Sequence, residues 1–253
     1  MKKIVFITGA TSGFGEACAR LFAANGWSLI LNGRRIERLK ELQKQLKAAH
    51  GTESYILPFD VRDQKEVFRQ VESLPQEWKA IDILINNAGL ALGRDLFQDA
   101  SLEDWDTMID TNVKGLLYVS KAVVPLMLER KKGHVINLGS VAAKEIYERG
   151  NVYCASKAAV DAISKSMRID MLPYNIKVTA IHPGAAVTEF SLVRFKGDKE
   201  TADKIYDGFK PLSADDVANV IYFTATLPEH VCINDLVLTC TQQADAIYFN
   251  KNS

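Results

Sequence analysis

Several hallmarks of metal-binding and disulfide-stabilised proteins are missing from this sequence of 253 residues. It has only four cysteines, Cys18, Cys154, Cys232 and Cys240, and they form no CxxC pair. Its four histidines form no HExxH arrangement. These absences argue against a zinc site and against a disulfide framework. We therefore expect no metal and a reducing, cytoplasmic compartment.

Charge of one sign is also not in excess, because 31 Lys and Arg residues balance 31 Asp and Glu residues. A nucleic-acid-binding surface usually shows as a basic excess. Charges interrupt every apolar run before 18 residues, which predicts no membrane span. The N-terminal "MKKIVFITGA" has lysines before a short apolar run but no cleavage site, so it predicts a buried strand. We expect a small-molecule partner, and neither nucleic acid nor a membrane.

What the sequence does contain is a regular alternation of strand-like and helix-like segments. Apolar runs without a polar face, typical of parallel strands buried on both sides, occur at residues 3–8, 28–32, 54–59, 81–86, 134–138, 177–181 and 235–239. Helical patterns lie between them, at residues 14–26, 35–49, 63–73, 103–130, 152–171 and 213–226. Repeated strand–helix units predict an α/β fold. We expect a single doubly wound Rossmann-type domain over residues 1–253, with a parallel sheet of about seven strands and helices on both faces.

One segment has little pattern of either kind. It runs from about residue 184 to residue 210, is polar, and contains Gly197 and Gly208. Such segments often move over a ligand site. We predict that it is a mobile substrate lid.

A glycine-rich stretch, "TGATSGFG", follows the first predicted strand and opens the first predicted helix. Its glycines are Gly9, Gly13 and Gly15. Glycines let the backbone turn sharply and let a pyrophosphate approach the N–H groups of the helix N-terminus. The alternative is a tight strand–helix turn that binds no ligand. The position of this stretch directly after the first predicted strand favours a phosphate-binding loop.

The end of the second predicted strand indicates which nicotinamide cofactor is used. An acidic residue there would bind the free 2′-hydroxyl of NAD. The sequence instead has Asn32 and Gly33, followed by Arg34 and Arg35. Two guanidinium groups pair well with a 2′-phosphate, so we predict NADP as the cofactor.

Tyr153 and Lys157, in "NVYCASKAAV", are four residues apart and share one face of a predicted helix. Taken alone, such a pair is more often an ordinary surface contact. Ser140, at a strand end, fits a simple helix N-cap equally well, and Asn112 fits a bend in a helix. Together with the glycine loop, however, these residues gather at the edge where open α/β sheets bind ligands, which favours catalysis.

The chain resembles the short-chain dehydrogenases/reductases over essentially its full length. The matching motifs are "TGATSGFG", "NNAG" at 86–89, Asn112 in "DTNVKG", Ser140 in "NLGS", "YCASK" at 153–157 and "HPG" at 182–184. Within that family, "TEFSLVRFKGD", "LSADDVA" and "INDLVLTCTQQ" resemble the NADP-dependent 3-hydroxy acid (serine) dehydrogenases. That subgroup oxidises serine and related short hydroxy acids.

The resemblance implies roles for individual residues. Tyr153 would be the proton donor or acceptor, Lys157 would lower its pKa and hold the nicotinamide ribose, Ser140 would position the substrate oxygen, and Asn112 would support a proton relay. Asn86, Ala88 and Gly89 would lie along the cofactor, and Asp60 and Val61 would contact its adenine. We expect the remaining cofactor contacts from Thr11, Ser12, Phe14, Asn87, Pro183, Gly184 and Thr188, besides the glycines and arginines named above. His182 could approach the nicotinamide, but a backbone-shaping role for "HPG" is favoured.

The substrate is less well determined by the sequence. An acid needs a cation, and Arg149, Arg194 and Lys196 are the candidates. We expect Arg149 or Arg194 to bind the carboxylate, because arginine is better suited to bidentate pairing, with Ser140 and Tyr153 at the substrate oxygen. Segment 141–150 is unusually charged for a substrate wall, which leaves a neutral ketone, aldehyde or sugar as an alternative. A cofactor-sensing protein without turnover is a further alternative. From the family we expect a homotetramer or homodimer.

Overall fold

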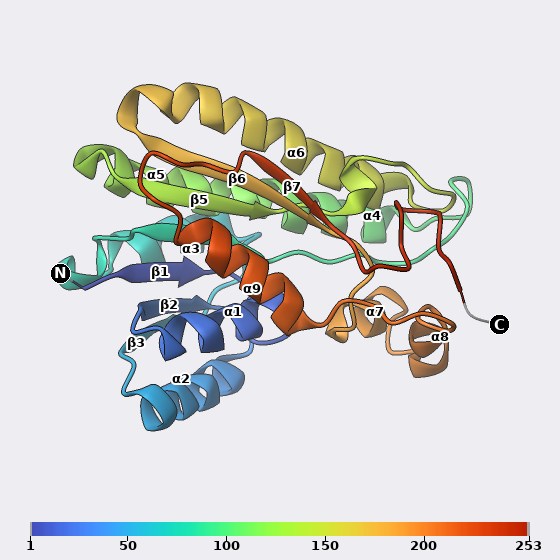
Figure 1. Ribbon diagram of the computed structural model, residues 1–253, viewed down its shortest axis with the longest axis horizontal. Coiled ribbons are helices and arrows are strands. Elements are labelled where there is room, and N and C mark those ends of the chain that lie inside the picture. The colour runs from blue at the N-terminus through green and yellow to red at the C-terminus, as the bar shows by residue number, and fades with distance from the viewer. Residues whose placement is uncertain (1, 252–253) are drawn as a thin grey trace.

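The computed structural model describes residues 2–251 and contains one parallel sheet of seven strands. The strands are β1 (Ile4–Ile7), β2 (Ser28–Asn32), β3 (Ser54–Leu57), β4 (Ile83–Asn86), β5 (Gly133–Leu138), β6 (Ile176–Pro183) and β7 (Asp235–Leu238). Their order across the sheet is β3-β2-β1-β4-β5-β6-β7. The predicted Rossmann-type α/β fold and its seven strands are confirmed (Figure 1).

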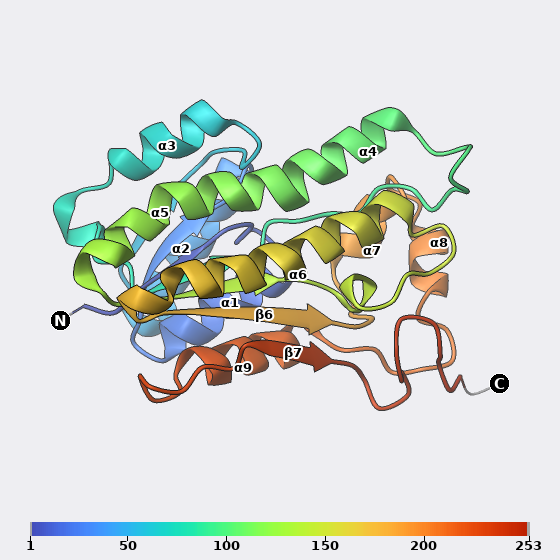
Figure 2. The same ribbon diagram turned by 90° about the horizontal axis from the view of Figure 1, so that it is seen from above.

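Helices cover both faces of this sheet (Figures 1 and 2). One face carries α1 (Gly13–Ala24), α2 (Ile36–His50) and α9 (Ala214–Ala225). The other carries α3 (Gln64–Glu72), α5 (Leu116–Arg130) and α6 (Asn151–Met171). In the part of the chain from residue 2 to residue 251, no helix combines the length and the apolar character needed to cross a membrane.

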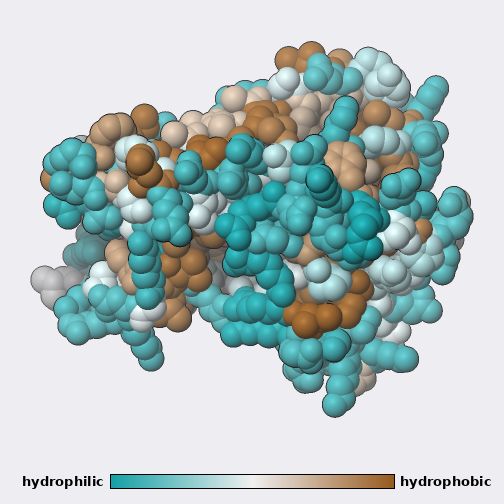
Figure 3. Space-filling model, turned by 180° about the vertical axis from the view of Figure 1, so that it is seen from behind, coloured by the Kyte–Doolittle hydropathy of each residue, from teal (hydrophilic) through white to brown (hydrophobic). Residues whose placement is uncertain are grey.

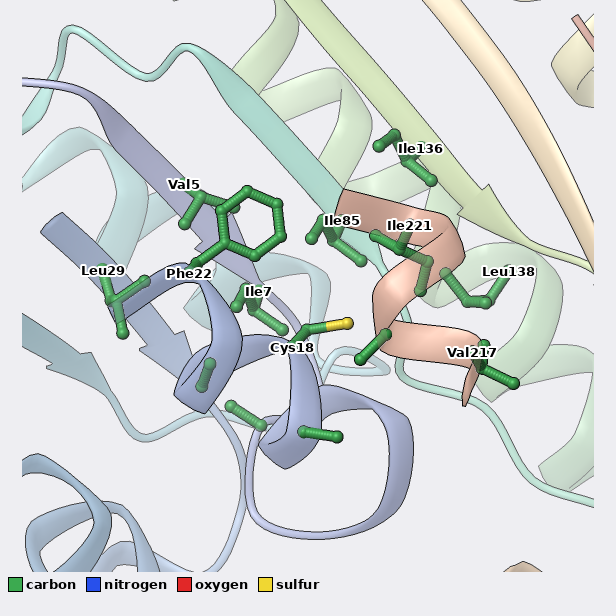
Figure 4. Packing of buried hydrophobic residues seen from close by; sticks show 14 of the residues in the cluster. Val5, Ile7, Cys18, Phe22, Leu29, Ile85, Ile136, Leu138, Val217 and Ile221 are labelled. Atoms are coloured by element: carbon green, nitrogen blue, oxygen red, sulfur yellow. The ribbon is translucent and has the colours of Figure 1, made fainter. Parts of the chain in front are cut away.

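Alternation along β1 explains why its whole sequence is apolar. Val5 and Ile7 belong to the core beneath α1, α2 and α9, whereas Ile4 and Phe6 belong to the core on the opposite face. Burying each such side chain contributes about 1.5–3 kcal/mol. Figure 4 shows the first core, where Cys18 of α1 packs among aliphatic side chains from the sheet and from α9. Burial raises the pKa of the Cys18 thiol, so this cysteine behaves as a small hydrophobic residue.

The strand order reverses between β1 and β4, because the chain moves outward from β1 to β3 and then returns to β4 on the other side. In open α/β sheets ligands bind outside the carboxyl ends of the strands at such a switch point. The fold therefore directs the loops after β1, β4, β5 and β6 to one edge.

Two segments differ from the sequence expectation. The helix expected over residues 103–130 is α4 (Leu102–Ile109) and α5 separated by one π-helical stretch, Asp110–Gly115, that contains Asn112. The segment expected to lack structure, residues 184–210, contains two short helices, α7 (Glu189–Arg194) and α8 (Lys199–Lys204). Thr188 and Asp198 cap these helices, because their side chains accept hydrogen bonds from N–H groups of the first turn.

Candidate active site

A cleft of about 1210 Å³ lies at the carboxyl edge of the sheet. Its lining includes the glycine-rich loop, the ends of β2 and of β4 to β6, and the segment after β3. The start of α6 and the loop before it, α7, α8 and the C-terminal segment near Phe249 complete it. Of the residues expected to contact the cofactor, the cleft is lined by Gly9, Thr11, Ser12, Gly13, Phe14, Arg34, Arg35, Asp60, Val61, Asn87, Ala88, Gly89, Tyr153, Lys157, Pro183, Gly184 and Thr188.

The glycine-rich loop has the geometry of an anion cradle. Gly9 and Gly13 adopt positive φ values of 66° and 53°, a region that side chains other than glycine rarely enter. A Cβ at Gly15 would lie 2.3 Å from the Gly9 carbonyl oxygen, so Gly15 lets α1 pack against the loop. The Ser12 side chain makes no capping hydrogen bond to α1. The first N–H groups of this helix therefore remain able to receive a phosphate.

The end of β2 presents cations where an NAD-binding acid would stand. The Arg34 side chain is 62% exposed and lies 3.8 Å from Asp60. Arg35 donates to the Thr11 and Ser12 hydroxyls at 3.0 and 2.9 Å. A Cβ at Gly33 would come within 2.7 Å of the Thr11 side chain, so a larger residue there would disturb the loop. These residues fit a cofactor with a 2′-phosphate.

Two ion pairs that the sequence does not predict connect this region to α7. Glu189 accepts hydrogen bonds from Arg35 at 2.9 Å and from Arg38 at 2.7 Å. The two arginines hold the pKa of Glu189 below its usual range, although partial burial raises it. The partners are more than 150 positions apart in sequence, so local patterns give no signal for this contact.

Tyr153 and Lys157 are one turn apart on α6 and both are buried. The Lys157 ammonium donates to the Leu138 carbonyl oxygen at 2.9 Å, and burial lowers its pKa to about 8. Burial also raises the pKa of Tyr153, whereas its hydrogen bond with the Ser140 side chain and the charge of Arg194 lower it. Arg194 is therefore a cation close to Tyr153, with its guanidinium carbon 5.4 Å from the centre of the Tyr153 ring, while the Lys157 ammonium bonds to the end of β5.

Ser140 combines the capping role and the position expected of it at the site. It is the N-cap of the short 3₁₀ helix Val141–Ala143, and its Oγ accepts a hydrogen bond from the Ala142 N–H at 3.1 Å. This leaves the hydroxyl hydrogen of Ser140 available for Tyr153 or for a substrate oxygen.

Asn112 is buried in the π-helical stretch and does not line the cleft. Its amide forms hydrogen bonds of 2.8 Å with both the N–H and the carbonyl of Leu90, and one of 3.0 Å with Ser156 on α6. Asn112 thereby connects the loop after β4 to the helix that carries Tyr153. Asn86 is also buried and does not line the cleft, and its amide donates to Ser120 and Asn137 in the core.

At the far end of the cleft lies Arg194, only 8% exposed. Its guanidinium donates to the Gly93 carbonyl at 3.2 Å and to the Tyr147 hydroxyl at 3.0 Å. No carboxylate of residues 2–251 lies within ion-pair distance of it, and a buried unpaired charge is costly. Arg149 lines the same cleft, whereas Lys196 pairs with Asp104 instead.

The side chains of segment 141–150 point in two directions. The charges of this segment were unexpected in a substrate wall. Glu148 and Arg149 line the cleft, as does Tyr147. Lys144 turns away from it and pairs with Asp161 and Asp235. Lys144 was one of the unexpected charges of this segment, whereas Tyr147 was not singled out, because nothing local indicates which side chains of a loop turn inward.

Comparisons with known proteins agree with this geometry. A model of the short chain dehydrogenase family matches residues 3–198. Sulfoacetaldehyde reductase 2 of Chromohalobacter salexigens is 49% identical over 96% of each chain, and the NADP-dependent 3-hydroxy acid dehydrogenase YdfG of Escherichia coli K12 is 48% identical over 96% of this chain and 97% of that protein. The closed form of a serine dehydrogenase complexed with NADP+ superposes with a TM-score of 0.91 at 46% identity, covering 99% of this chain and all of that one. The chain belongs to the short-chain dehydrogenase family, as its motifs predict.

Proposed function

We propose that this protein is an NADP-dependent oxidoreductase that interconverts a short 3-hydroxy acid resembling serine and its oxo or semialdehyde form. The observation that carries the substrate assignment is the buried Arg194, which has no carboxylate partner within residues 2–251. A carboxylate substrate would supply the missing charge and form two parallel hydrogen bonds with it. The names of the relatives and the NADP+ bound to the similar serine dehydrogenase support the same reaction and cofactor.

In this proposal Tyr153 acts as the acid–base group. A bound nicotinamide cofactor supplies or accepts the hydride. Tyr153 gives its proton to the carbonyl oxygen during reduction and takes it back during oxidation. The Ser140 hydroxyl donates a hydrogen bond to the same oxygen as negative charge develops on it. Lys157, with a pKa of about 8, is mostly an ammonium at pH 7 and adds positive charge to the wall of the cleft. Asn112 holds the loop after β4 against α6 and would support the proton relay.

Initial rates with a small panel of substrates test this function. We expect oxidation of L-serine and 3-hydroxyisobutyrate with NADP+, much slower oxidation with NAD+, and poor oxidation of 1-propanol. Preference for the neutral alcohol would favour the carbonyl reductase alternative. Tight NADPH binding without turnover of any member would favour a cofactor sensor.

A second candidate reaction is the reduction of sulfoacetaldehyde, for which one relative is named. A sulfonate is an anion with three acceptor oxygens, so Arg194 and Arg149 together suit it as well as they suit a carboxylate. Sulfoacetaldehyde with NADPH therefore belongs in the panel. Whichever class of anion, carboxylate or sulfonate, is turned over with the higher kcat/KM is the preferred substrate class.

Replacing Arg194 with methionine should raise the KM for 3-hydroxyisobutyrate about 10- to 100-fold, because one charged hydrogen-bonded partner is lost. Arg194 also contacts Tyr153, so the informative quantity is the ratio of kcat/KM for the acid to that for 1-propanol. This ratio should fall by the same factor. Arg149→Asn, which tolerates the positive φ of 63° at this position, tests the second cation in the same way.

Lys196→Met is the matched control, since Lys196 is a nearby cation that pairs with Asp104 and does not line the cleft. It should leave the acid-to-alcohol ratio unchanged. If neither Arg194→Met nor Arg149→Asn lowers that ratio, the carboxylate is bound elsewhere.

We also propose that the chain works as one domain with residues 184–210 as a substrate lid. Two contacts support this role, because they attach α7 to both halves of the cleft. Glu189 pairs with Arg35 and Arg38 on the cofactor side. The backbone and side chain of Arg194 bond to Gly93 on the substrate side.

A homotetramer or homodimer is our proposal for the assembly. Exposed apolar side chains remain on the helices after packing, among them Leu102 of α4, Leu117 of α5 and Ile169 of α6. Figure 3 shows hydrophobic residues gathered along the upper part of one face. Contacts between copies would bury such side chains. A mass near 28.1 kDa by light scattering, that of one chain, would contradict it.

A further inference from the structure

Four charged or titratable side chains meet behind Ser140, and none of them lines the cleft. His182 lies near the end of β6, Asp161 on α6, Asp235 at the start of β7, and Lys144 just after the 3₁₀ helix that Ser140 opens. The mechanism proposed above makes no use of them. Yet the cluster contacts the backbone of Ser140 through His182.

His182 is completely buried against the end of β5. Its Nδ1 lies 3.3 Å from the Ser140 nitrogen and 3.2 Å from the Ser140 carbonyl oxygen. A Cβ at Gly139 would lie 2.3 Å from that same Nδ1, so the ring packs directly on the chain that leads to Ser140. Any change in the position of this imidazole is therefore transmitted to Ser140.

The other ring nitrogen of His182 faces two carboxylates. Its Nε2 lies 3.6 Å from Asp161 and 3.5 Å from Asp235, and forms no hydrogen bond within the described chain. Burial lowers the pKa of His182 and the charge of Lys144 lowers it further, which together outweigh the opposing effect of Asp235 and Asp161. At neutral pH the ring is therefore uncharged and carries one proton. Two negative groups beside Nε2 favour the proton on that nitrogen. Nδ1 then has a lone pair and accepts the hydrogen bond that the Ser140 N–H donates.

We propose that His182 is a positioning residue for Ser140, and that Asp161 and Asp235 set the tautomer that it needs for this task. This inference rests on the proposed function, in which Ser140 holds the substrate oxygen. Lys144 secures the other end of the same short helix, because its ammonium bonds to Asp161 at 3.1 Å and to Asp235 at 2.6 Å. The segment that carries Ser140 is thus attached to the network at both ends.

A metal ion is a weaker explanation of the same cluster. The Lys144 ammonium already bonds to both carboxylates, at the place where a cation would bind. Lys165 pairs with Asp161 at 2.8 Å as well. The two negative charges are therefore balanced by two positive charges, and a divalent ion would have to displace an ammonium.

Two variants of His182 whose new side chains have similar shapes, asparagine and leucine, test the proposal. Asparagine places an amide oxygen near the position of Nδ1, where it can accept from the Ser140 N–H, whereas leucine has the same branching without an acceptor. We expect His182→Leu to lower kcat for 3-hydroxyisobutyrate about tenfold, with the KM for NADP+ unchanged. His182→Asn should stay within about threefold of the wild type. The primary deuterium isotope effect on kcat should increase in the leucine variant only, because misplacing Ser140 slows the hydride step.

His134→Leu is the matched control, because His134 is also buried, bonds to Thr179, and lies outside the cleft. It should leave kcat and the isotope effect at wild-type values. Equal kcat in the leucine and asparagine variants of His182, whether both high or both low, would overturn the positioning role.

A second readout does not depend on activity. Long-range ¹H–¹⁵N correlation spectra of the wild-type protein report which ring nitrogen of His182 carries the proton. We expect the proton on Nε2 in the wild type and a mixture of tautomers in Asp161→Asn. A proton on Nδ1 in the wild type would overturn the inference even in a fully active enzyme. A wild type that oxidises no member of the panel but has its proton on Nε2 would instead contradict the proposed function.

Discussion

Replacing Tyr153 with phenylalanine should lower kcat for 3-hydroxyisobutyrate oxidation about 10³-fold, within the range expected for losing a general acid–base group. The buried aromatic ring is retained, and so is its packing against Phe190, whose ring centre lies 5.7 Å from that of Tyr153. Burial raises the pKa of the Tyr153 hydroxyl, so at neutral pH the substitution removes a neutral group and leaves no unpaired charge on Tyr153. Thermal unfolding should therefore change little, and the KM for NADP+ should stay near its wild-type value.

Tyr222→Phe provides the comparison, since Tyr222 also packs against a phenylalanine ring but lies on α9, outside the cleft. Its kcat should equal that of the wild type. Retention of more than about a tenth of wild-type kcat by Tyr153→Phe would mean that another group transfers the proton.

Replacing Lys157 with methionine should abolish most activity and yet stabilise the fold at pH 7. The folded chain lowers the pKa of Lys157 from 10.5 to about 8 because the ammonium is buried. The folded state thus disfavours the charged form, and this loss of stability is fully present below pH 8. We expect Lys157→Met to raise the free energy of unfolding by about 1–3 kcal/mol at pH 7, after allowing for the lost hydrogen bond to Leu138.

The pH dependence of this difference is the decisive part of the Lys157 experiment. As the pH rises from about 8 towards 10.5, the folded lysine loses its proton first and the penalty disappears. Denaturant unfolding at pH 7 and pH 10 should therefore show the stabilisation at the lower pH only. Lys204→Met, at a mostly exposed lysine paired with Glu200, should change stability by less than about 0.5 kcal/mol at pH 7. A less stable Lys157→Met protein at pH 7 would show that the buried ammonium contributes net stability.

The central strands β1 and β4 are fully buried and read as almost unbroken apolar runs, and the long helices on the two faces have a recognisable period. The π-helical stretch at Asn112 could not be predicted, since the helical pattern continues through it. It is stabilised instead by hydrogen bonds to Leu90 and Ser156, which are distant in sequence. Helices α7 and α8 were missed because six residues are too few to show a period.

The candidate site was located by the order of its motifs, but its electrostatics depend on long-range contacts. Arg194 was one of three candidate cations in the sequence. Its place in the cleft and its burial without a carboxylate partner among residues 2–251 distinguish it from Lys196. The expected effect of Lys157 on the pKa of Tyr153 was implied by the family resemblance. The direction of the Lys157 side chain towards Leu138 is set by the end of β5 and has no signature in the local sequence.

A crystal structure with NADP+ and 3-hydroxyisobutyrate bound tests the central claim most directly. We predict the substrate hydroxyl within hydrogen-bond distance of both Tyr153 Oη and Ser140 Oγ, the carboxylate against the Arg194 guanidinium, and residues 184–210 covering both ligands. A carboxylate in solvent, or a hydroxyl beyond the reach of Tyr153, would contradict the proposed reaction.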